Sequence, residues 1–182
     1  KKNCFHNKWL RNIVEPWLKR GNYFVLFYPR DKRLFLGEKI VTPYRSKSNT
    51  FAYNNYEWFA SIDVTFISNK TDILSLKYVL AVLNSKLIEF WLWHKGKKKG
   101  AILELYPRPI GEIPVKEISP KHQKYFISLV DKILNITKSK DYLSDSIKQA
   151  QAKEYENQID RMVYELYGLT KREVEIVKES FG

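Results

Sequence analysis

The spacing of apolar residues along the chain changes from short alternating runs to long helical periods, which predicts a mixed structure. Residues 23–28 are aromatic and β-branched and are typical of a strand, and residues 34–42 predict a second strand interrupted by Gly37. Residues 57–68 alternate well enough for another strand or hairpin, and residues 101–106 predict one more strand. Together these runs indicate a mixed β-sheet.

Helical periods occur in two places before the C-terminal third. Residues 9–19 place apolar side chains three and four positions apart, although Pro16 kinks this helix or limits it to its first turn. Residues 75–93 form a longer amphipathic helix that Ser75 is expected to cap and that stops near Lys95. We expect this second helix to brace the core.

The C-terminal third carries start and stop signals for helices over residues 122–137 and 143–167 and for a short last helix. In chain order the signals are Ser119-Pro120 as a start, Gly168 as a stop, and Thr170 with Glu173 as a capping box. The predicted fold class is therefore α+β: a mixed β-sheet body with a bracing helix, followed by a helical C-terminal segment containing an antiparallel helix pair plus a short terminal helix. We predict two domains, residues 1–118 and 119–182.

The segments between these elements are polar, basic or rich in proline. Residues 43–55 form a polar loop rich in Ser, Asn, Tyr and Arg, and residues 97–100 form a basic loop of three lysines and a glycine. Three closely spaced prolines predict an extended or turning path, namely Pro107, Pro109 and Pro114.

Composition excludes several classes of protein. The 182 residues are 44% hydrophobic and 29% charged, which is a globular ratio and not that of a disordered or collagenous chain. Cys4 is the single cysteine, so no intrachain disulfide forms and a reducing compartment fits best. No apolar run is long enough to span a bilayer and no secretory signal is visible, so we expect no membrane partner. Because the chain begins at Lys1 and its one methionine is Met162, we expect a piece of a longer protein.

The positive charge is concentrated near the N-terminus. The formal net charge is +12, of which residues 1–50 carry +9, residues 51–118 carry +2 and residues 119–182 carry +1. A one-sided positive field attracts phosphate backbones or anionic membrane surfaces, although a charge of this size also confers simple solubility. Because the charge is interleaved with aromatic residues, we favour a polyanion partner.

Sequence motifs for catalysis and cofactor binding are missing. The chain has no Gly-rich dinucleotide turn, no P-loop, no paired-histidine zinc motif, no Glu-x-Lys nuclease motif and no Asn-Pro-Pro or Asp-Pro-Pro motif of amino-methyltransferases. Cys4 has no evident base partner, and the three histidines lack metal-ligand spacing. We therefore predict no catalytic residue, cofactor or metal in this chain.

Three stretches have side chains suited to nucleic acid. Residues 44–49 and 53–55 offer Arg for guanine, Asn for adenine and Lys for phosphate, although an ordinary polar loop explains them equally well. Residues 95–99 contain four lysines suited to phosphate, although a solvated charge run is commoner. Residues 28–33 form a basic turn beside a tyrosine that suits a groove or a stacked base, and a solvated hairpin tip competes with this interpretation. Three such stretches on one body strengthen the joint hypothesis.

Several segments in a fixed order carry a family resemblance, which covers most of residues 20–180. The most specific are Leu83-Asn84-Ser85-Lys86 and Val-Tyr-Glu-Leu-Tyr-Gly-Leu at residues 163–169. The remaining ones are residues 37–46, 51–54, 61–67, 76–82, 98–100, 104–106, 113–115 and 159–162. Together they resemble the C-terminal target-recognition (specificity) domain of TaqI-like adenine-specific DNA methyltransferases, most closely those of type IIG restriction-modification enzymes.

The resemblance implies a division of labour with another part of the polypeptide. In that family an N-terminal domain binds S-adenosylmethionine and methylates adenine N6, and type IIG members also carry a nuclease domain. The specificity domain holds the duplex and reads its sequence while the target adenine is flipped into the methyltransferase pocket. The expected partners are therefore double-stranded DNA and a methyltransferase domain, in the cytoplasm of a prokaryotic cell.

The candidate DNA-binding residues combine base readers with phosphate contacts. Arg45, Asn49, Asn54 and Asn55 are the candidates for base edges. The full set is Arg30, Lys32, Arg33, Lys39, Tyr44, Arg45, Lys47, Asn49, Asn54, Asn55, Lys95, Lys97, Lys98 and Lys99. Two alternatives stay open, a separate specificity subunit that partners methylase chains and a non-catalytic basic nucleic-acid-binding module.

Overall fold

The computed structural model describes residues 32–69 and 73–181. The chain divides into two compact units, Lys1–Arg33 and Leu34–Gly182, and the architecture below is that of the second. The helix predicted at residues 9–19, the strand predicted at residues 23–28 and the candidate Arg30 lie outside the described residues.

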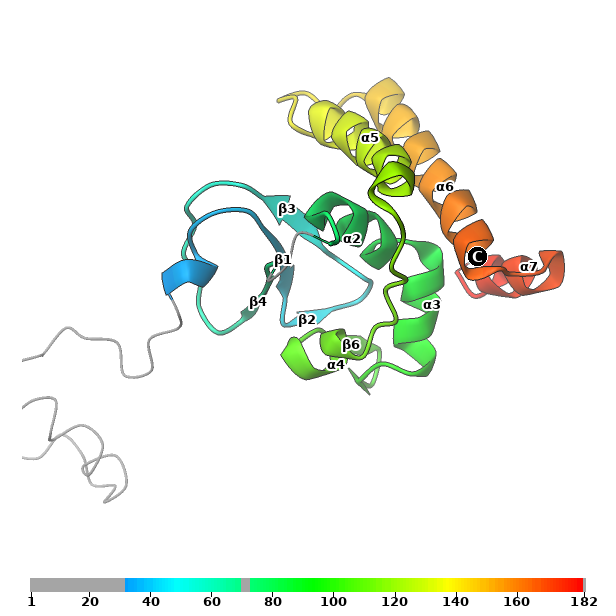
Figure 1. The fold of residues 1–182 in the computed structure, drawn as a ribbon, viewed down its shortest axis with the longest axis horizontal. Coiled ribbons are helices and arrows are strands. Elements are labelled where there is room, and N and C mark those ends of the chain that lie inside the picture. The colour runs from blue at the N-terminus through cyan, green and yellow to red at the C-terminus, as the bar shows by residue number, and fades with distance from the viewer. Residues whose placement is uncertain (1–31, 70–72, 182) are drawn as a thin grey trace, which may run out of the picture. The chain divides into compact units, whose positions relative to one another are not determined.

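Two small antiparallel sheets form the β part of the fold (Figure 1). After a 3-10 turn, η1 (Lys32–Leu34), strand β1 (Lys39–Pro43) lies between β3 (Ala52–Asn54) and β4 (Val64–Ile67). In the second sheet, β6 (Ile102–Glu104) lies between β2 (Arg45–Ser46) and β5 (Lys98–Lys99). With the helices that follow, these sheets confirm the α+β class.

Three local predictions were wrong in detail. Residues 43–55 are not one loop, because they contribute β2 to one sheet and β3 to the other. The strand predicted over residues 57–68 is confined to β4. The proline-rich segment begins with a short helix, α4 (Pro107–Gly111), because a proline at the first helical position lacks only an N–H that has no partner there anyway.

The bracing helix is interrupted, and so forms two helices. Ser75 caps α2 (Leu76–Leu83) as predicted by accepting a hydrogen bond from the Lys77 amide, but a new helix, α3 (Lys86–His94), begins after Ser85. The Ser85 hydroxyl accepts from the Ile88 amide and donates to the Val82 carbonyl, so it serves both helix ends. Asn84 and Ser85 are consecutive residues of types that prefer helix ends, so the helix breaks there although the apolar stripe continues.

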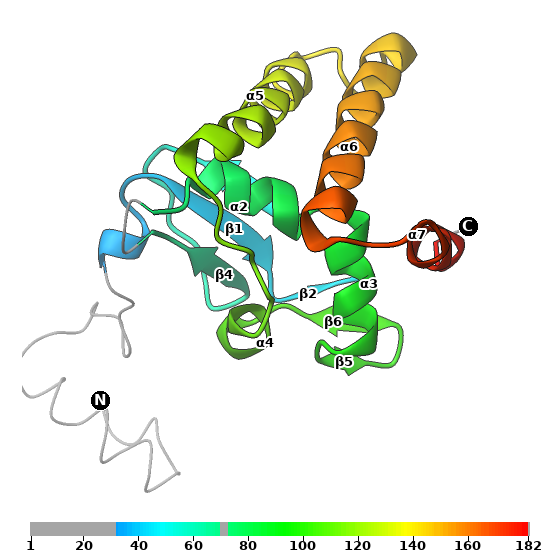
Figure 2. The same cartoon turned by 45° about the vertical axis from the view of Figure 1, so that its right-hand side comes forward.

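The C-terminal helices follow the prediction closely. Helices α5 (Pro120–Thr137) and α6 (Ser146–Tyr167) contact each other and lie side by side in Figure 1, and α5 also packs on α2. Figure 2 shows the loop that joins the two helices at one end. Gly168 ends α6 at a positive φ of 71°, and Thr170 and Glu173 form the capping box of α7 (Lys171–Glu179). The core lies where α2 meets the sheets and this helix pair, and α2 itself is almost entirely buried.

Candidate nucleic-acid interface

The β2-β6-β5 sheet brings together two of the three predicted basic stretches. Arg45 on β2 is directly opposite Glu104 on β6, and Lys97 immediately precedes β5 on the other side. Arg45 Nε lies 3.8 Å from Glu104 Oε1, and Lys97 Nζ lies 3.5 Å from Glu104 Oε2. The sheet therefore places one cation on each side of a single carboxylate.

Two tyrosines form an aromatic pair beside these charges. The rings of Tyr44 and Tyr106 stack with centroids 5.0 Å apart and planes 17° apart. The Arg45 guanidinium lies 5.8 Å from the Tyr44 centroid, and Lys97 Nζ lies 4.9 Å from the Tyr106 centroid. Each cation thus contacts one ring and the shared carboxylate. We call Tyr44, Arg45, Lys97, Glu104 and Tyr106 the cation-tyrosine cluster.

Contacts within the cluster favour the charged form of Lys97, and further lysines lie close to it along the chain. The contact with the Tyr106 hydroxyl, and then the Glu104 carboxylate, raises the pKa of Lys97. Lys98 Nζ donates to the Trp93 carbonyl at 2.7 Å and lies 5.9 Å from a Trp93 ring, which turns this side chain toward α3. Lys95 and Lys99 are exposed, so the β5 hairpin presents several ammonium groups to solvent.

A hollow of about 450 Å³ lies next to the cluster. Pro43, Tyr44 and Arg45 line it from β1 and β2, and Ile62 and Asp63 line it from the segment before β4. The Tyr44 amide donates to the Asp63 carbonyl at 2.7 Å, which ties the two segments together. One wall of the hollow is thus formed by Tyr44 and Arg45, whose side chains the stacking and ion-pair contacts already position.

Sequence reasoning missed two residues of the cluster and one exposed arginine that follows it in the chain. Glu104 and Tyr106 were not candidates. Glu104 ends β6 and Tyr106 is in extended conformation two residues later, so a period of two predicts both side chains on one face. Arg108 was also missed, and its side chain is 89% exposed at the start of α4, with Glu112 as an ion-pair partner 3.8 Å away. The pattern Tyr-Pro-Arg-Pro was the available signal for a helix start that presents an arginine.

Lys39, one predicted phosphate contact, is an interior residue. Its side chain is only 1% exposed, and Nζ donates to the carbonyls of Phe35, Gly37 and Tyr56 at 2.7–3.0 Å. Burial lowers the pKa of this ammonium group, while Glu57 acts in the opposite direction. A phosphate cannot reach Lys39 here, because the ammonium group already satisfies three buried carbonyls.

Two of the four predicted base readers also have internal partners. Asn49 Nδ2 donates to the carbonyls of Leu83 and Ser85, at the junction of α2 and α3. Asn54 is buried, and its Oδ1 accepts from the Tyr56 amide. These bonds help to hold the segment of residues 43–55 in place, and they occupy the Asn49 donor and the Asn54 acceptor that a two-bond adenine contact would need. Asn55 and Lys47 are exposed, as are Lys32 and Arg33, which belong to the first unit.

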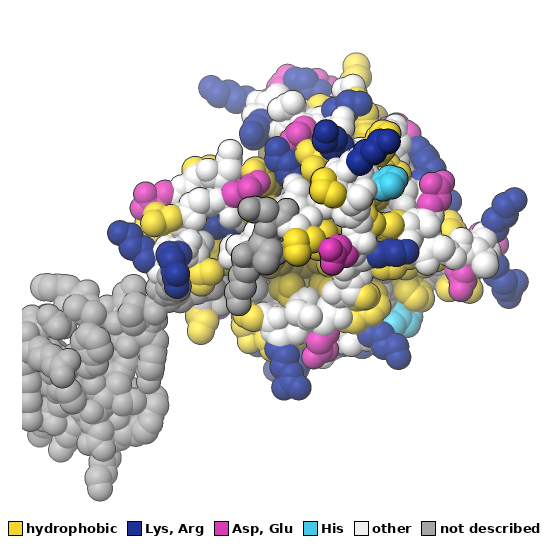
Figure 3. Space-filling model, in the orientation of Figure 1, with side chains coloured by type: hydrophobic (Ala, Val, Ile, Leu, Met, Phe, Trp, Pro, Cys, Tyr) yellow, Lys and Arg dark blue, Asp and Glu magenta, His cyan; other side chains and the backbone are white. Residues whose placement is uncertain are grey.

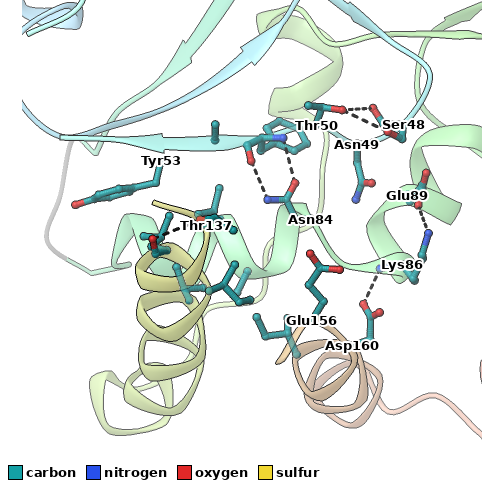
Figure 4. Close-up of a pocket in the computed structure, with 18 of the residues that line it drawn as sticks. Ser48, Asn49, Thr50, Tyr53, Asn84, Lys86, Glu89, Thr137, Glu156 and Asp160 are labelled. Carbon is teal, nitrogen blue, oxygen red and sulfur yellow. Dashed lines mark hydrogen bonds and ion pairs between the residues drawn. The ribbon is translucent and has the colours of Figure 1, made fainter. Parts of the chain in front are cut away.

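A second cavity of about 510 Å³ lies on the side of α2 that faces the helix pair. Figure 4 shows Asn49 pointing toward the side of this cavity where Glu156 and Asp160 of α6 lie, whereas Asn84 points to the neighbouring strand. Asp160 accepts a hydrogen bond from the Lys86 amide at 2.8 Å, and burial raises the pKa of its carboxyl group. In the part of the chain that the structure describes, no cluster of His, Cys, Asp and Glu side chains could hold a metal ion.

Surface charge alone does not single out an interface. Figure 3 shows Lys and Arg side chains scattered over one face of the molecule, with Asp and Glu side chains between them. The cation-tyrosine cluster differs from this background because two cations share one carboxylate there and each of them also lies near a tyrosine ring. None of the described helices combines the length and apolar character needed to cross a membrane.

Comparison with known proteins identifies the family. The model of the TaqI-like C-terminal specificity domain matches residues 2–115. The chain belongs to this family. The chain is 31% identical over 122 residues to the type II methyltransferase M.HindII of Haemophilus influenzae strain Rd. It is 30% identical over 122 residues to the type II methyltransferase M.HincII of Haemophilus influenzae.

These alignments define how much of each protein is compared. Each covers 64% of this chain but only 22% and 23% of M.HindII and M.HincII, respectively. The chain therefore spans less than a quarter of the length of these relatives. The resemblance inferred from the residues is confirmed at the level of the family. The specificity-domain match ends before α5, so α5, α6 and α7 lie beyond it.

Proposed function

We propose that this chain is the sequence-specific double-stranded DNA recognition domain of a restriction-modification adenine-N6 methyltransferase of the type IIG kind. It positions the duplex for a methyltransferase, and for a nuclease where one is present, on another part of the polypeptide. The single observation that carries the proposal is the cation-tyrosine cluster within a chain of the specificity-domain family.

The cluster has the two kinds of group that duplex recognition requires. Lysines neutralise phosphates and contribute affinity that is independent of sequence and sensitive to salt, whereas arginine can read guanine through two hydrogen bonds. We assign Arg45 to a base edge. The residues that we assign to phosphates or other backbone contacts are Lys32, Arg33, Lys47, Lys95, Lys97, Lys98 and Lys99. Asn55 stays a candidate base reader because it is exposed.

The missing chemistry then belongs to another domain. S-adenosylmethionine would bind in a methyltransferase domain of the same polypeptide, and such an enzyme would work in the prokaryotic cytoplasm, where its DNA lies. We further propose the domain division at residue 118, with α5 and α6 facing the methyltransferase domain. Residues 119–182 carry a net charge of only +1, which suits a protein contact better than a DNA contact.

A salt titration tests the proposal directly. The chain is titrated against a fluorescent duplex of random sequence at several salt concentrations, and the slope of log K against log salt is measured. Replacing Lys97, Lys98 and Lys99 together by Glu should flatten the slope by about 2–3, since each phosphate contact contributes about 0.9. The control reverses three exposed lysines on or near α5, namely Lys121, Lys124 and Lys140.

The two triple variants have the same net charge, so they separate a local surface from bulk charge. We expect the control to bind within about threefold of the wild type at physiological salt, because salt screens charges that lie more than about 8 Å from the bound duplex. Equal losses in both variants would indicate non-specific attraction. A wild-type chain that shows no salt-sensitive duplex binding would refute the proposed function altogether.

A further inference from the structure

Glu104 is an unexpected residue at a surface that binds a polyanion. A carboxylate repels phosphates, and this one lies at the centre of the cation-tyrosine cluster with its side chain 11% exposed. Burying a carboxylate is unfavourable unless partners compensate for the lost water. The partners that compensate for this burial are the two cations of the cluster, so the function of Glu104 is to be sought in its contacts with them.

The backbone determines where the two cations start. Glu104 is on the middle strand, Arg45 is its direct cross-strand neighbour on β2, and the Glu104 amide donates to the Lys97 carbonyl at 2.8 Å. On the side-chain level each carboxylate oxygen faces a different cation, Oε1 toward Arg45 and Oε2 toward Lys97. One carboxylate therefore restrains two long side chains at once.

The tyrosines restrain the same side chains from a second direction. Tyr44 lies under Arg45, Tyr106 lies under Lys97, and the two rings stack on each other. Arginine and lysine lose considerable rotamer freedom on binding, so partners that limit this freedom beforehand reduce the cost of recognition. Arg45 nevertheless stays 59% exposed and faces Glu104 through Nε, so its terminal nitrogens can extend from the surface.

Orientation matters more for a base than for a phosphate. An arginine contacts guanine O6 and N7 only in a narrow geometry, whereas a lysine satisfies a phosphate from many directions. A carboxylate that orients Arg45 thus improves discrimination between sequences, while its charge weakens attraction to the phosphate backbone. Removing the Glu104 charge should therefore lower the selectivity between DNA sequences and raise the overall affinity for DNA.

We propose that Glu104 is a positioning residue that orients Arg45 toward a guanine edge of duplex DNA, and that it does so at some cost in overall affinity. This inference rests on the proposed function and names the group that sets its selectivity. The other carboxylate oxygen holds Lys97 beside Arg45. Lys97 can then bind a DNA phosphate while Arg45 contacts the guanine.

The test compares selectivity with affinity in Glu104→Gln, which preserves shape and removes the charge. The probes are a random duplex pool, the duplex that the wild-type chain enriches from this pool, and the same duplex with 7-deazaguanine in place of guanine. We expect the wild type to prefer the enriched duplex over its 7-deaza form by about tenfold, because 7-deazaguanine lacks the N7 acceptor and so loses one of the two hydrogen bonds from a charged donor. In Glu104→Gln this ratio should fall to about twofold or less, with unchanged or tighter binding to the random pool.

Two controls separate orientation from other effects. Glu117→Gln makes the same charge change at an exposed residue and should leave the ratio unchanged. In an Arg45→Ala background, Glu104→Gln should no longer lower the ratio, because it acts through Arg45. A merely structural role for Glu104 would lower binding to all probes and the melting temperature together.

The possible failures are distinguishable. If the wild type shows no salt-sensitive duplex binding, the proposed function fails and this inference fails with it. If the wild type binds duplex DNA but enriches no sequence, or if Glu104→Gln keeps the wild-type ratio, this inference alone is overturned. An equal loss of selectivity from Glu104→Gln in the Arg45→Ala background would also overturn it.

Discussion

Replacing Asn84 by Ala should weaken the attachment of the segment of residues 43–55 to the α2–α3 junction, where the Asn49 contacts remain. The Asn84 side chain forms two hydrogen bonds with one residue, accepting from the Phe51 amide at 3.1 Å and donating to the Phe51 carbonyl at 2.9 Å. Phe51 is only 6% exposed, so water cannot fully replace these partners. Each lost hydrogen bond contributes about 1 kcal/mol, and a buried backbone group without a partner costs about 1–3 kcal/mol.

These contributions predict that Asn84→Ala lowers the free energy of unfolding by about 2–4 kcal/mol. The measurement is urea unfolding followed by circular dichroism and by tryptophan fluorescence, with both signals fitted together. Asn55→Ala is the matched control, because Asn55 is exposed on the neighbouring segment and should change stability by less than about 0.5 kcal/mol.

Asn84→Asp refines the test. At neutral pH an aspartate keeps an acceptor for the Phe51 amide but has no donor for the Phe51 carbonyl. The Asn84→Asp variant should therefore also be less stable than the wild type. Its deficit should shrink as the pH falls below about 4, because a protonated carboxyl group can donate. If Asn84→Ala costs no more than Asn55→Ala, the Asn84–Phe51 link does not hold this segment and our interpretation of the junction is wrong.

Three further predictions concern buried and capping groups. Lys39→Met should destabilise the protein by about 1–3 kcal/mol in urea unfolding, because it leaves three carbonyls without a donor, whereas Lys47→Met at an exposed site should cost less than about 0.5 kcal/mol. The folded-state pKa of Asp160 is raised above its ordinary value of 3.8, so the wild type should gain stability as the pH falls through that raised pKa. Asp160→Asn keeps an acceptor for the Lys86 amide and should flatten this pH dependence; an unchanged profile would contradict the assignment. Thr170→Ala removes the capping box, and hydrogen exchange in α7 should then accelerate with a loss of about 1 kcal/mol; protection equal to the wild type would contradict it.

Local signals were sufficient for the C-terminal helices. Ser119-Pro120, Gly168 and the Thr170–Glu173 box act through atoms a few residues away, so their effect hardly depends on the rest of the chain. The same is true of Ser75 at the start of α2. Asn84 and Ser85 were also a local signal for the break between α2 and α3, but the apolar stripe that continues across them predicted one long helix.

The candidate site was predictable in residue type but not in arrangement. Arg45 and the lysines of residues 95–99 were found because clustered cations are visible in a linear chain. Glu104 was not predicted, because its role depends on the strand pairing that places it between Arg45 and Lys97. Conversely, Lys39 and Asn49 had suitable chemistry for DNA, but long-range packing gave both of them internal partners.

For this protein, then, the amino-acid sequence determined the fold class, the family and the main helices, since these depend on periodicity and short-range capping. Which polar side chains face solvent was decided only on folding. A hydrogen bond between residues 33 positions apart, such as that between Phe51 and Asn84, exists only when the chain has brought them together. Burial and charge pairing depend on which residues the fold brings together. A lysine or an asparagine at one position can therefore be exposed and suited to DNA, while a residue of the same type at another position forms internal hydrogen bonds.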